Sequence, residues 1–222
     1  MKNNIFKVWI GTSIAIIVIL SVITKSSIFQ IIAAVFGILY LYCNVIENKY
    51  GQICGVINTG IYGVIMFSTG LYGTAVYDLL YCVPMQIYTF FTWGKDKTGK
   101  NKKEISRYTN VQREMGLIAV VIVILIYTAV ATKLNVNFAL IDGISIILGA
   151  LGMYFTSQKK VEQWYLFIIN NIAMIFLWVI KVMESTSNLP MLLMWIVYLI
   201  NNTYGLISWN KKLKTNTSDE SK

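Results

Sequence analysis

Long apolar stretches without a charged residue are the feature that most constrains how this chain can fold. Seven such runs separate successive charged residues, and each is about as long as the roughly 17–25 residues with which an α-helix crosses a bilayer. The chain of 222 residues is 56% hydrophobic and 13% charged, with a mean hydropathy of +0.62. Soluble domains of this size are far less apolar, so the sequence predicts an all-α integral membrane protein.

The longest apolar region, residues 51–93, contains Gly70 within the sequence FSTGLYG, which is typical of a break between two helices. Pro84 is expected to kink the second of these helices. With this break, the sequence predicts eight transmembrane helices: 6–24, 27–46, 51–69, 71–93, 114–132, 135–156, 161–181 and 189–209.

Basic residues are distributed unevenly among the predicted connections. If the N-terminus is cytoplasmic, sixteen of the nineteen Lys and Arg residues lie in cytoplasmic segments, and only Lys25, Lys133 and Lys181 lie outside. This asymmetry follows the positive-inside rule, and eight spans then place both termini in the cytoplasm. The net charge of +9 is explained by topology and by contact with anionic lipid, so we expect no nucleic-acid partner.

Two segments, MQIYTFFTWGK (85–95) and NNTYGLISWNK (201–211), resemble each other within the chain. At an offset of 116 residues, the matched pairs include Gln86 and Asn202, Tyr88 and Tyr204, and Trp93 and Trp209. Helices two to four and six to eight are therefore predicted to be two copies of a three-helix unit. Such odd-numbered units need a single connecting helix if both are to insert the same way up, which gives a 3+1+3 parallel repeat.

This repeat predicts a single membrane domain over residues 1–211. It consists of an extra N-terminal helix, a first three-helix bundle over 27–95, the linker helix 114–132 and a second three-helix bundle over 135–211. Residues 212–222 are predicted to form a cytoplasmic tail.

Two of the predicted helices carry an aromatic pair followed by an amide on one face. The spacing is that of residues i, i+3 and i+7, which lie on the same side of an α-helix. The residues with this spacing are Trp164, Phe167 and Asn171 in one helix and Trp195, Tyr198 and Asn202 in the other. Such a face suits a planar ligand, because its ring stacks on the aromatic side chain and the amide hydrogen-bonds its edge.

Further amides at similar depth, Asn58 and Gln86, are expected from the first three-helix unit. An amide in a membrane helix often only joins neighbouring helices through a hydrogen bond, worth about 0.6 kcal/mol on average. This alternative stays open, above all for Asn170 beside Asn171. The number of amides and their aromatic neighbours favour a substrate site formed by both units.

Two acidic residues, Asp78 and Asp142, lie inside predicted spans, about two helical turns from the expected external ends. Carboxylates within a membrane are rare and usually have a functional role, so each of these residues is a candidate for proton coupling. We expect neither at the depth of the amides, which favours structural pairing or a role at the external entrance. Trp93 and Trp209, next to charged residues, are expected to anchor helix ends at the membrane surface.

Few groups in the sequence are suited to catalysis or metal binding. The chain has no histidine, its three cysteines lie in apolar segments without ligand spacing, and no Ser or Cys lies beside a base. We therefore expect no cofactor, no metal site and no enzymatic activity. A phosphate-binding loop of the form G-x-x-x-x-G-K-[ST] is also missing from the sequence, so this chain alone is not expected to drive transport with a nucleotide.

The segments FSTGLYGTAVYDLLYCVPMQIYTFFTWGK and MLLMWIVYLINNTYGLISWNKK resemble the PnuC family of bacterial vitamin transporters, whose archetype takes up nicotinamide riboside. The resemblance implies a 3+1+3 arrangement like that of a SWEET transporter. The family pattern W-x-x-W-x-x-x-N, which is associated with substrate binding, falls on Trp164, Phe167 and Asn171, with Phe167 in place of the second Trp.

The resemblance also implies facilitated diffusion across the bacterial inner membrane, followed by trapping when a cytoplasmic kinase phosphorylates the substrate. A homotrimer is the assembly that it suggests. Nicotinamide riboside is the expected substrate, with thiamine, riboflavin or a deoxynucleoside as alternatives within the family. A proton-coupled carrier or a SWEET-like sugar carrier is the alternative mode of transport.

Overall fold

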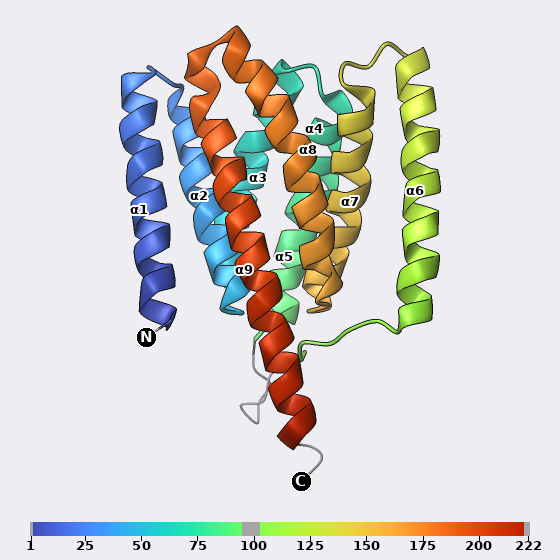
Figure 1. Cartoon of the computed structure of the whole chain (residues 1–222). Helices are drawn as coiled ribbons and strands as arrows, with labels where there is room; N and C mark the ends of the chain where they lie inside the picture. Colours follow the sequence, from blue (N-terminus) through green and yellow to red (C-terminus); the bar gives the residue numbers. More distant parts are fainter. Residues whose placement is uncertain (1, 95–102, 220–222) are drawn as a thin grey trace.

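The computed structural model describes residues 2–94 and 103–219, in which the chain forms nine α-helices, one π-helical turn and one 3-10 turn (Figure 1). The α-helices are α1 (Lys2–Ile23), α2 (Ile28–Val45), α3 (Gly51–Ser68), α4 (Tyr72–Tyr77), α5 (Val83–Thr92), α6 (Asn110–Lys133), α7 (Ala139–Ser157), α8 (Glu162–Glu184) and α9 (Leu189–Asp219). The π-helical turn is η1 (Asp78–Cys82) and the 3-10 turn is η2 (Thr186–Asn188). The predicted bundle end at residue 95 and the last residues of the predicted tail lie outside the described part.

Seven of the described helices are long and apolar enough to cross a membrane, namely α1, α2, α3, α6, α7, α8 and α9. They coincide with seven of the eight predicted spans. In place of the predicted helix 71–93, the structure has α4, η1 and α5 in direct succession. Seven of the eight predicted spans thus correspond to helices of the required length, and the remaining one corresponds to an interrupted helical run. The predicted break at Gly70 is confirmed, because this residue has a φ of +82°.

The interruption has a local cause in Pro84. Proline has no N–H and its ring clashes with the carbonyl four residues earlier, so a regular α-helix cannot pass through this position. The chain instead widens into η1, where the N–H of Val83 donates to the carbonyl of Asp78. A π-helical turn contains an extra residue that changes the direction of the neighbouring side chains, and such turns are frequent at functional sites. The distortion at Pro84 thus takes the form of a widened turn.

Helices α2, α3 and α5 pack in succession, as do α7, α8 and α9, and these two sets are called the two bundles below. The first helix of each bundle packs against the third helix of the other, because α2 contacts α9 and α7 contacts α5. Helix α1 packs against α2 and α9, whereas α6 packs against α7 at the far edge of the molecule (Figure 1). The interior between the bundles is therefore lined by both halves of the chain.

The turn between α2 and α3 and the turn between α7 and α8 have the same backbone geometry. Glu47 in the first and Lys159 in the second adopt left-handed φ values of +59° and +51°. In both turns the N–H of this residue donates to the carbonyl three residues earlier, and the N–H of the next residue donates to the carbonyl five residues before it. The two bundles thus share a local structure at positions 112 residues apart.

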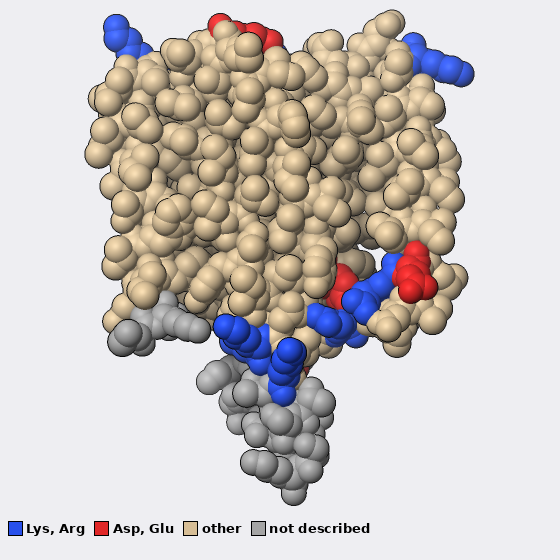
Figure 2. Space-filling model, viewed as in Figure 1, with Lys and Arg blue, Asp and Glu red and all other residues tan. Residues whose placement is uncertain are grey.

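The outer surface has a broad uncharged middle, and most of its visible Lys and Arg side chains gather at one end (Figure 2). This end, called the basic end below, is the end at which α1 begins and α9 finishes (Figure 1). Its described residues include Arg107, Arg113, Lys159 and Lys160. The uncharged middle is the surface expected of a protein that is surrounded by lipid.

Candidate functional site

A cavity of about 90 Å³ lies between the two bundles. Its amide-bearing lining residues are Asn58, Gln86, Asn170, Asn171 and Asn202. Its aromatic lining residues are Tyr40, Tyr62, Tyr77, Phe167, Trp195 and Tyr198. Amides and aromatic rings thus meet in one space.

The predicted site residues that line the cavity are Asn58, Gln86, Phe167, Asn171, Trp195, Tyr198 and Asn202. Trp164 is the predicted residue that the structure does not bring to it. Its side chain is buried and packs edge-on against Trp209, with ring centroids 5.2 Å apart and an interplanar angle of 89°. Trp164 therefore belongs to the packing between α8 and α9 near the basic end.

Four of the cavity amides each contain a buried polar atom without a hydrogen-bond partner among the described residues. These atoms are Oε1 of Gln86, Oδ1 of Asn170, Nδ2 of Asn171 and Oδ1 of Asn202. A buried polar group left unpaired costs about 1–3 kcal/mol, and such groups are rare in folded proteins. Buried amides outside the cavity, those of Gln30, Gln52, Gln163 and Asn201, also contain an unpaired atom, so a missing partner alone does not mark a site. The cavity is distinguished because three acceptors and one donor converge on one space, as expected of a site that hydrogen-bonds a ligand.

Asn58 differs from these amides because both ends of its side chain are engaged. Its Nδ2 donates to the carbonyl of Ala33 at 2.8 Å, and its Oδ1 accepts a hydrogen bond from the Tyr198 hydroxyl at 3.3 Å. Asn58 thereby joins α3 to both α2 and α9. Gln86 is intermediate, because its Nε2 donates to Thr59 at 2.8 Å while its Oε1 is unpaired. The helix-joining alternative thus describes the contacts of Asn58 and of Nε2 of Gln86, but not those of Asn170, Asn171 and Asn202.

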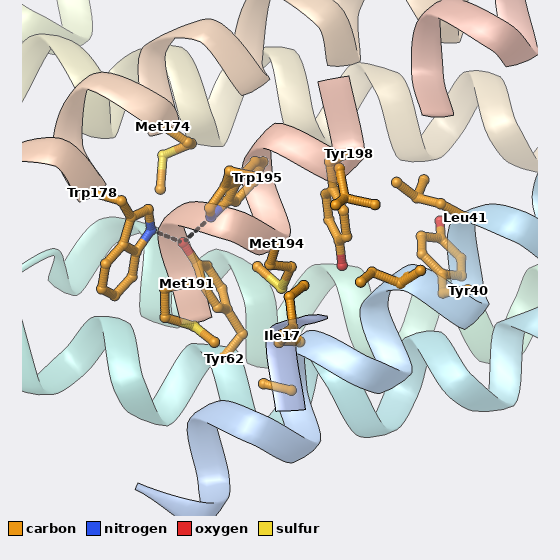
Figure 3. Packing of buried hydrophobic residues seen from close by; sticks show 14 of the residues in the cluster. Ile17, Tyr40, Leu41, Tyr62, Met174, Trp178, Met191, Met194, Trp195 and Tyr198 are labelled. Carbon is orange, nitrogen blue, oxygen red and sulfur yellow. Dashed lines mark hydrogen bonds between the residues drawn. The ribbon is translucent and has the colours of Figure 1, made fainter. Parts of the chain in front are cut away.

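One wall of the cavity is held by a tyrosine hydroxyl that accepts two indole hydrogen bonds. Nε1 of Trp178 donates to the Tyr62 hydroxyl at 2.9 Å, and Nε1 of Trp195 donates to the same oxygen at 3.0 Å (Figure 3). All three side chains are buried. This network joins α3, α8 and α9 and fixes the ring of Trp195 beside the cavity.

Sequence reasoning missed Tyr62, and it also missed Tyr40 and Tyr77 on the cavity wall. The chain has 14 tyrosines, and none of these three belongs to the aromatic–amide spacing that marked the other site residues. Their only sequence signal is a polar hydroxyl within an apolar run, which many tyrosines in membrane helices share.

Asp78 also lines the cavity, and its side chain is only 7% exposed. The prediction that it would lie away from the amides is wrong. Asp78 begins the π-helical turn η1, which packs against α3 at Gly63, where an added Cβ would lie 3.0 Å from Cγ of Leu79 and 3.3 Å from the Cβ of Asp78. The absence of a side chain at Gly63 therefore lets η1 lie close to α3. Its Oδ2 has no hydrogen-bond partner within the described part of the chain.

Asp142 lies outside the cavity and is fully paired. One carboxylate oxygen accepts hydrogen bonds from the backbone N–H of Thr74 at 2.9 Å and from its hydroxyl at 2.6 Å. The other oxygen accepts a hydrogen bond from the Tyr127 hydroxyl at 2.5 Å. Asp142 thus joins α7 to α4 and α6, which agrees with the expectation of structural pairing for this residue.

Two tryptophans make reciprocal contacts between the bundles at the basic end. Nε1 of Trp93 donates to the carbonyl of Thr156 at 3.1 Å, and Nε1 of Trp209 donates to the carbonyl of Val45 at 3.2 Å. Trp93 is 1% exposed and Trp209 is 0% exposed. The prediction that they anchor helix ends at the membrane surface is therefore wrong, because both rings fill the space between the bundles.

An ion cluster lies beside these tryptophans. Glu47 pairs with Lys159 at 2.8 Å and with Lys212 at 2.6 Å, so that it links the α2–α3 turn to the α7–α8 turn and to α9. Burial alone would raise the pKa of Glu47, but the hydrogen bonds and charges of the two lysines outweigh it and lower the pKa below its ordinary value. Nζ of Lys159 also lies 5.2 Å from the centre of the Trp93 ring.

Comparison with known proteins agrees with this architecture. The family model described as "Nicotinamide mononucleotide transporter" matches residues 27–211. The nicotinamide riboside transporter PnuC of Neisseria mucosa is 28% identical over 217 residues, which are 93% of this chain and 81% of that protein. The crystal structure of the vitamin B3 transporter PnuC superposes with a TM-score of 0.80 and 26% identity, over 94% of this chain and 92% of that chain.

The family match contains both bundles and every residue that lines the cavity. The resemblance inferred from the sequence is confirmed: this chain belongs to the family of nicotinamide mononucleotide transporters that includes PnuC, and it is a membrane transport protein rather than an enzyme.

Proposed function

We propose that this protein takes up nicotinamide riboside across the bacterial inner membrane, through a site in the cavity between its two bundles. The observation that carries this proposal is the set of unpaired amide atoms on the cavity wall. A nicotinamide ring and its ribose offer an amide N–H₂ and hydroxyl donors for the oxygens of Gln86, Asn170 and Asn202. The carbonyl of the ring amide offers an acceptor for Nδ2 of Asn171, and Phe167 and Trp195 offer faces for stacking.

The names of the similar proteins support this substrate class, and the cavity chemistry favours a riboside over a mononucleotide. The described lining residues include no Lys or Arg. A phosphate buried in such a space would lack a counter-charge and would cost a large desolvation penalty. Thiamine, riboflavin and deoxynucleosides remain the alternative substrates, because each offers a planar ring with a hydrogen-bonding edge.

Transport requires the cavity to change shape. At about 90 Å³ it is smaller than the roughly 300–1,000 Å³ of typical ligand pockets, so its lining side chains must move to admit a riboside. We infer alternating access in which the two bundles rock against each other around the central site. The Glu47–Lys159 pair and the reciprocal contacts of Trp93 and Trp209 hold the basic end together and must part during the cycle.

The arrangement that we infer is an eight-span, SWEET-like 3+1+3 repeat. The interrupted run over residues 72–92 would be the fourth span, α6 the linker and α1 the extra helix. The reciprocal tryptophan contacts support it, because they would follow from a two-fold axis along the membrane normal. The turn geometry at Glu47 and Lys159 is consistent with it, but the same geometry also occurs at Lys25 and Asn135. In this arrangement residues 1–211 form one membrane domain, with bundles over 27–95 and 135–211.

We infer that the basic end faces the cytoplasm, with both termini on that side, because the positive-inside rule predicts it. Single-cysteine variants in a background without the three native cysteines test this orientation. Cysteine at Arg107 should be protected from an impermeant maleimide in intact cells, whereas cysteine at Lys133 should react. The reverse pattern would contradict the orientation.

The energetics that we propose are those of facilitated diffusion, with a cytoplasmic kinase phosphorylating the substrate and so trapping it. Uptake of radiolabelled nicotinamide riboside into proteoliposomes tests both substrate and mechanism. We expect uptake to stop when the inner and outer concentrations are equal, and to be unaffected by an imposed pH gradient. Accumulation driven by a pH gradient would instead identify a proton-coupled carrier, and competition by sugars but not by vitamins would identify a sugar carrier.

The homotrimer is proposed from the family resemblance. Mass measurement of the purified protein by light scattering, with the detergent contribution subtracted, tests it against a monomer mass of 25.2 kDa. A protein mass near three times this value is expected, and a monomer at working concentrations would contradict it.

A further inference from the structure

Asp78 is the one charged side chain among the described residues that line the cavity. Its side chain is 7% exposed, and Oδ2 has no hydrogen-bond partner in that part of the chain. No ion pair joins Asp78 to any described lysine or arginine. A buried carboxylate without a counter-charge is costly, so proteins that keep one in a membrane pair it with a cation or use it in function.

The surroundings of Asp78 are also those of a cation site. Six aromatic side chains line the same cavity, including Tyr62 and Tyr77 close to the start of η1. Faces of aromatic rings attract cations, and boxes of aromatic side chains are a recurring way to bind organic cations. A single carboxylate within an aromatic lining that has no basic residue is therefore complementary to an aromatic ring that carries a positive charge.

The other buried aspartate, Asp142, differs from Asp78 in both its contacts and its place. Asp142 has hydrogen-bond donors on both carboxylate oxygens, from Thr74 and Tyr127, and it does not line the cavity. The local fold also brings Asp78 to the cavity, because the π-helical turn before Pro84 starts at this residue and Gly63 lets that turn lie close to α3.

We propose that Asp78 is a specificity-determining residue, whose carboxylate pairs with the positive charge of a bound heteroaromatic ring. The transporter then selects pyridinium or thiazolium compounds over neutral rings of the same size. This proposal rests on the proposed function, because it assigns a role within the same substrate site. The proposal also favours two of the candidate substrates over the others, since nicotinamide riboside and thiamine carry such a charge, whereas riboflavin and deoxynucleosides do not.

Calorimetric titration with two ligands of nearly the same shape tests the proposal. Nicotinamide riboside is a cation, whereas its dihydro form has a neutral ring. We expect the wild-type protein to bind the cation at least about tenfold more tightly than the neutral form. In Asp78→Asn, affinity for the cation should fall roughly 10- to 100-fold, while affinity for the neutral form stays within about threefold, because the amide keeps the shape and loses the charge.

Asp142→Asn is the matched control, since it removes the charge of the other buried acid outside the cavity. Its ratio of affinities for the two ligands should equal that of the wild type, whatever happens to its thermal stability. Asp78→Glu, which keeps the charge, should retain a larger preference for the cation than Asp78→Asn. Binding of the neutral ligand to Asp78→Asn shows in the same experiment that the variant is folded.

Equal affinity of the wild type for both ligands would overturn the proposal, even if Asp78→Asn could not be purified. An equal loss of both affinities in Asp78→Asn, or the same change of ratio in Asp142→Asn, would overturn it too. Failure of the proposed function has a different signature: the wild type would bind neither ligand, or Asn171→Ala would bind both as well as the wild type does.

Discussion

Replacement of Glu47 by glutamine should destabilise the protein through the lysine that it leaves behind. The side chain of Lys159 is only 3% exposed and lies 2.8 Å from the Glu47 carboxylate. Removal of one partner of a buried ion pair typically costs about 3–5 kcal/mol, because the other charge stays buried without compensation. Glu47 is 18% exposed and the contact of Lys159 with the Trp93 ring persists, so we expect a value near the low end, about 3 kcal/mol.

Replacement of Lys159, the other partner of the pair, should destabilise the protein much less than replacement of Glu47. Lys159→Met removes the buried charge, keeps an apolar stem beside Trp93, and leaves Glu47 paired with Lys212 at 2.6 Å. We expect a cost below about 1 kcal/mol, and a similar cost for the double variant Glu47→Gln/Lys159→Met, because buried pairs replaced by apolar groups are often nearly neutral. The coupling energy between the two sites is then about 3 kcal/mol, because the costs of Lys159→Met and of the double variant cancel.

Unfolding of the four proteins by SDS in mixed micelles, followed by circular dichroism, measures these free energies. We expect the free energy of unfolding to fall strongly in Glu47→Gln and only slightly in Lys159→Met and in the double variant. If Glu47→Gln cost no more than Lys159→Met, the burial of an uncompensated lysine could not be the cause, and the reasoning would be refuted.

Two further predictions concern the same network and the cavity wall. Tyr62→Phe leaves two buried indole N–H groups without an acceptor and should lower the free energy of unfolding by about 2–6 kcal/mol in the same SDS assay, whereas Trp178→Phe, which removes one of these bonds, should cost less. The ion cluster should also depend on pH in one direction only: because the pKa of Glu47 is lowered from 4.5, its stabilisation is complete at neutral pH and is lost as the pH falls through the lowered value. The stability difference between wild type and Glu47→Gln should therefore be constant from pH 6 to 8 and shrink below about pH 4.5; a difference that instead grew on acidification would contradict the assignment.

The sequence predicts the spans well because bilayer thickness and the cost of burying charge act on every residue of a membrane helix. Seven of the predicted spans correspond to described helices of the required length. The run over residues 72–92 shows the limit of this reasoning. Hydropathy depends only on residue type and carries no information on backbone geometry. It therefore does not predict the π-helical turn that precedes Pro84.

The candidate site was predictable to the extent that helical spacing defines a face. Phe167 and Asn171 lie on one face of α8 and reach the cavity, as the i, i+4 relation requires. Trp164 shares that face but lies one turn nearer the basic end, where Trp209 covers it. Spacing along one helix fixes a direction, and only the neighbouring helices decide at which depth a cavity opens.

Asp78 and Asn58 show why contacts between helices escape sequence reasoning. The distance of Asp78 from a helix end predicts a depth away from the amides, but the widened turn that starts at Asp78 brings this residue to the cavity. Asn58 reaches the cavity as predicted, yet Ala33 and Tyr198 engage both ends of its side chain. The helices that carry Ala33 and Tyr198 are separate elements, and their register relative to α3 does not follow from the pattern of α3 alone.

Two adjacent amides of α9 allow the most direct test of the central claim, that unpaired amides in the cavity bind an aromatic vitamin. Both contain an unpaired buried atom, Nδ2 of Asn201 and Oδ1 of Asn202, but only Asn202 lines the cavity, whereas Asn201 accepts the indole hydrogen bond of Trp9 in α1 at 3.1 Å. Calorimetric titration of nicotinamide riboside should show about a tenfold weaker Kd for Asn202→Ala and a change below about twofold for Asn201→Ala. Equal effects of the two substitutions, or no binding by the wild type, would contradict the account.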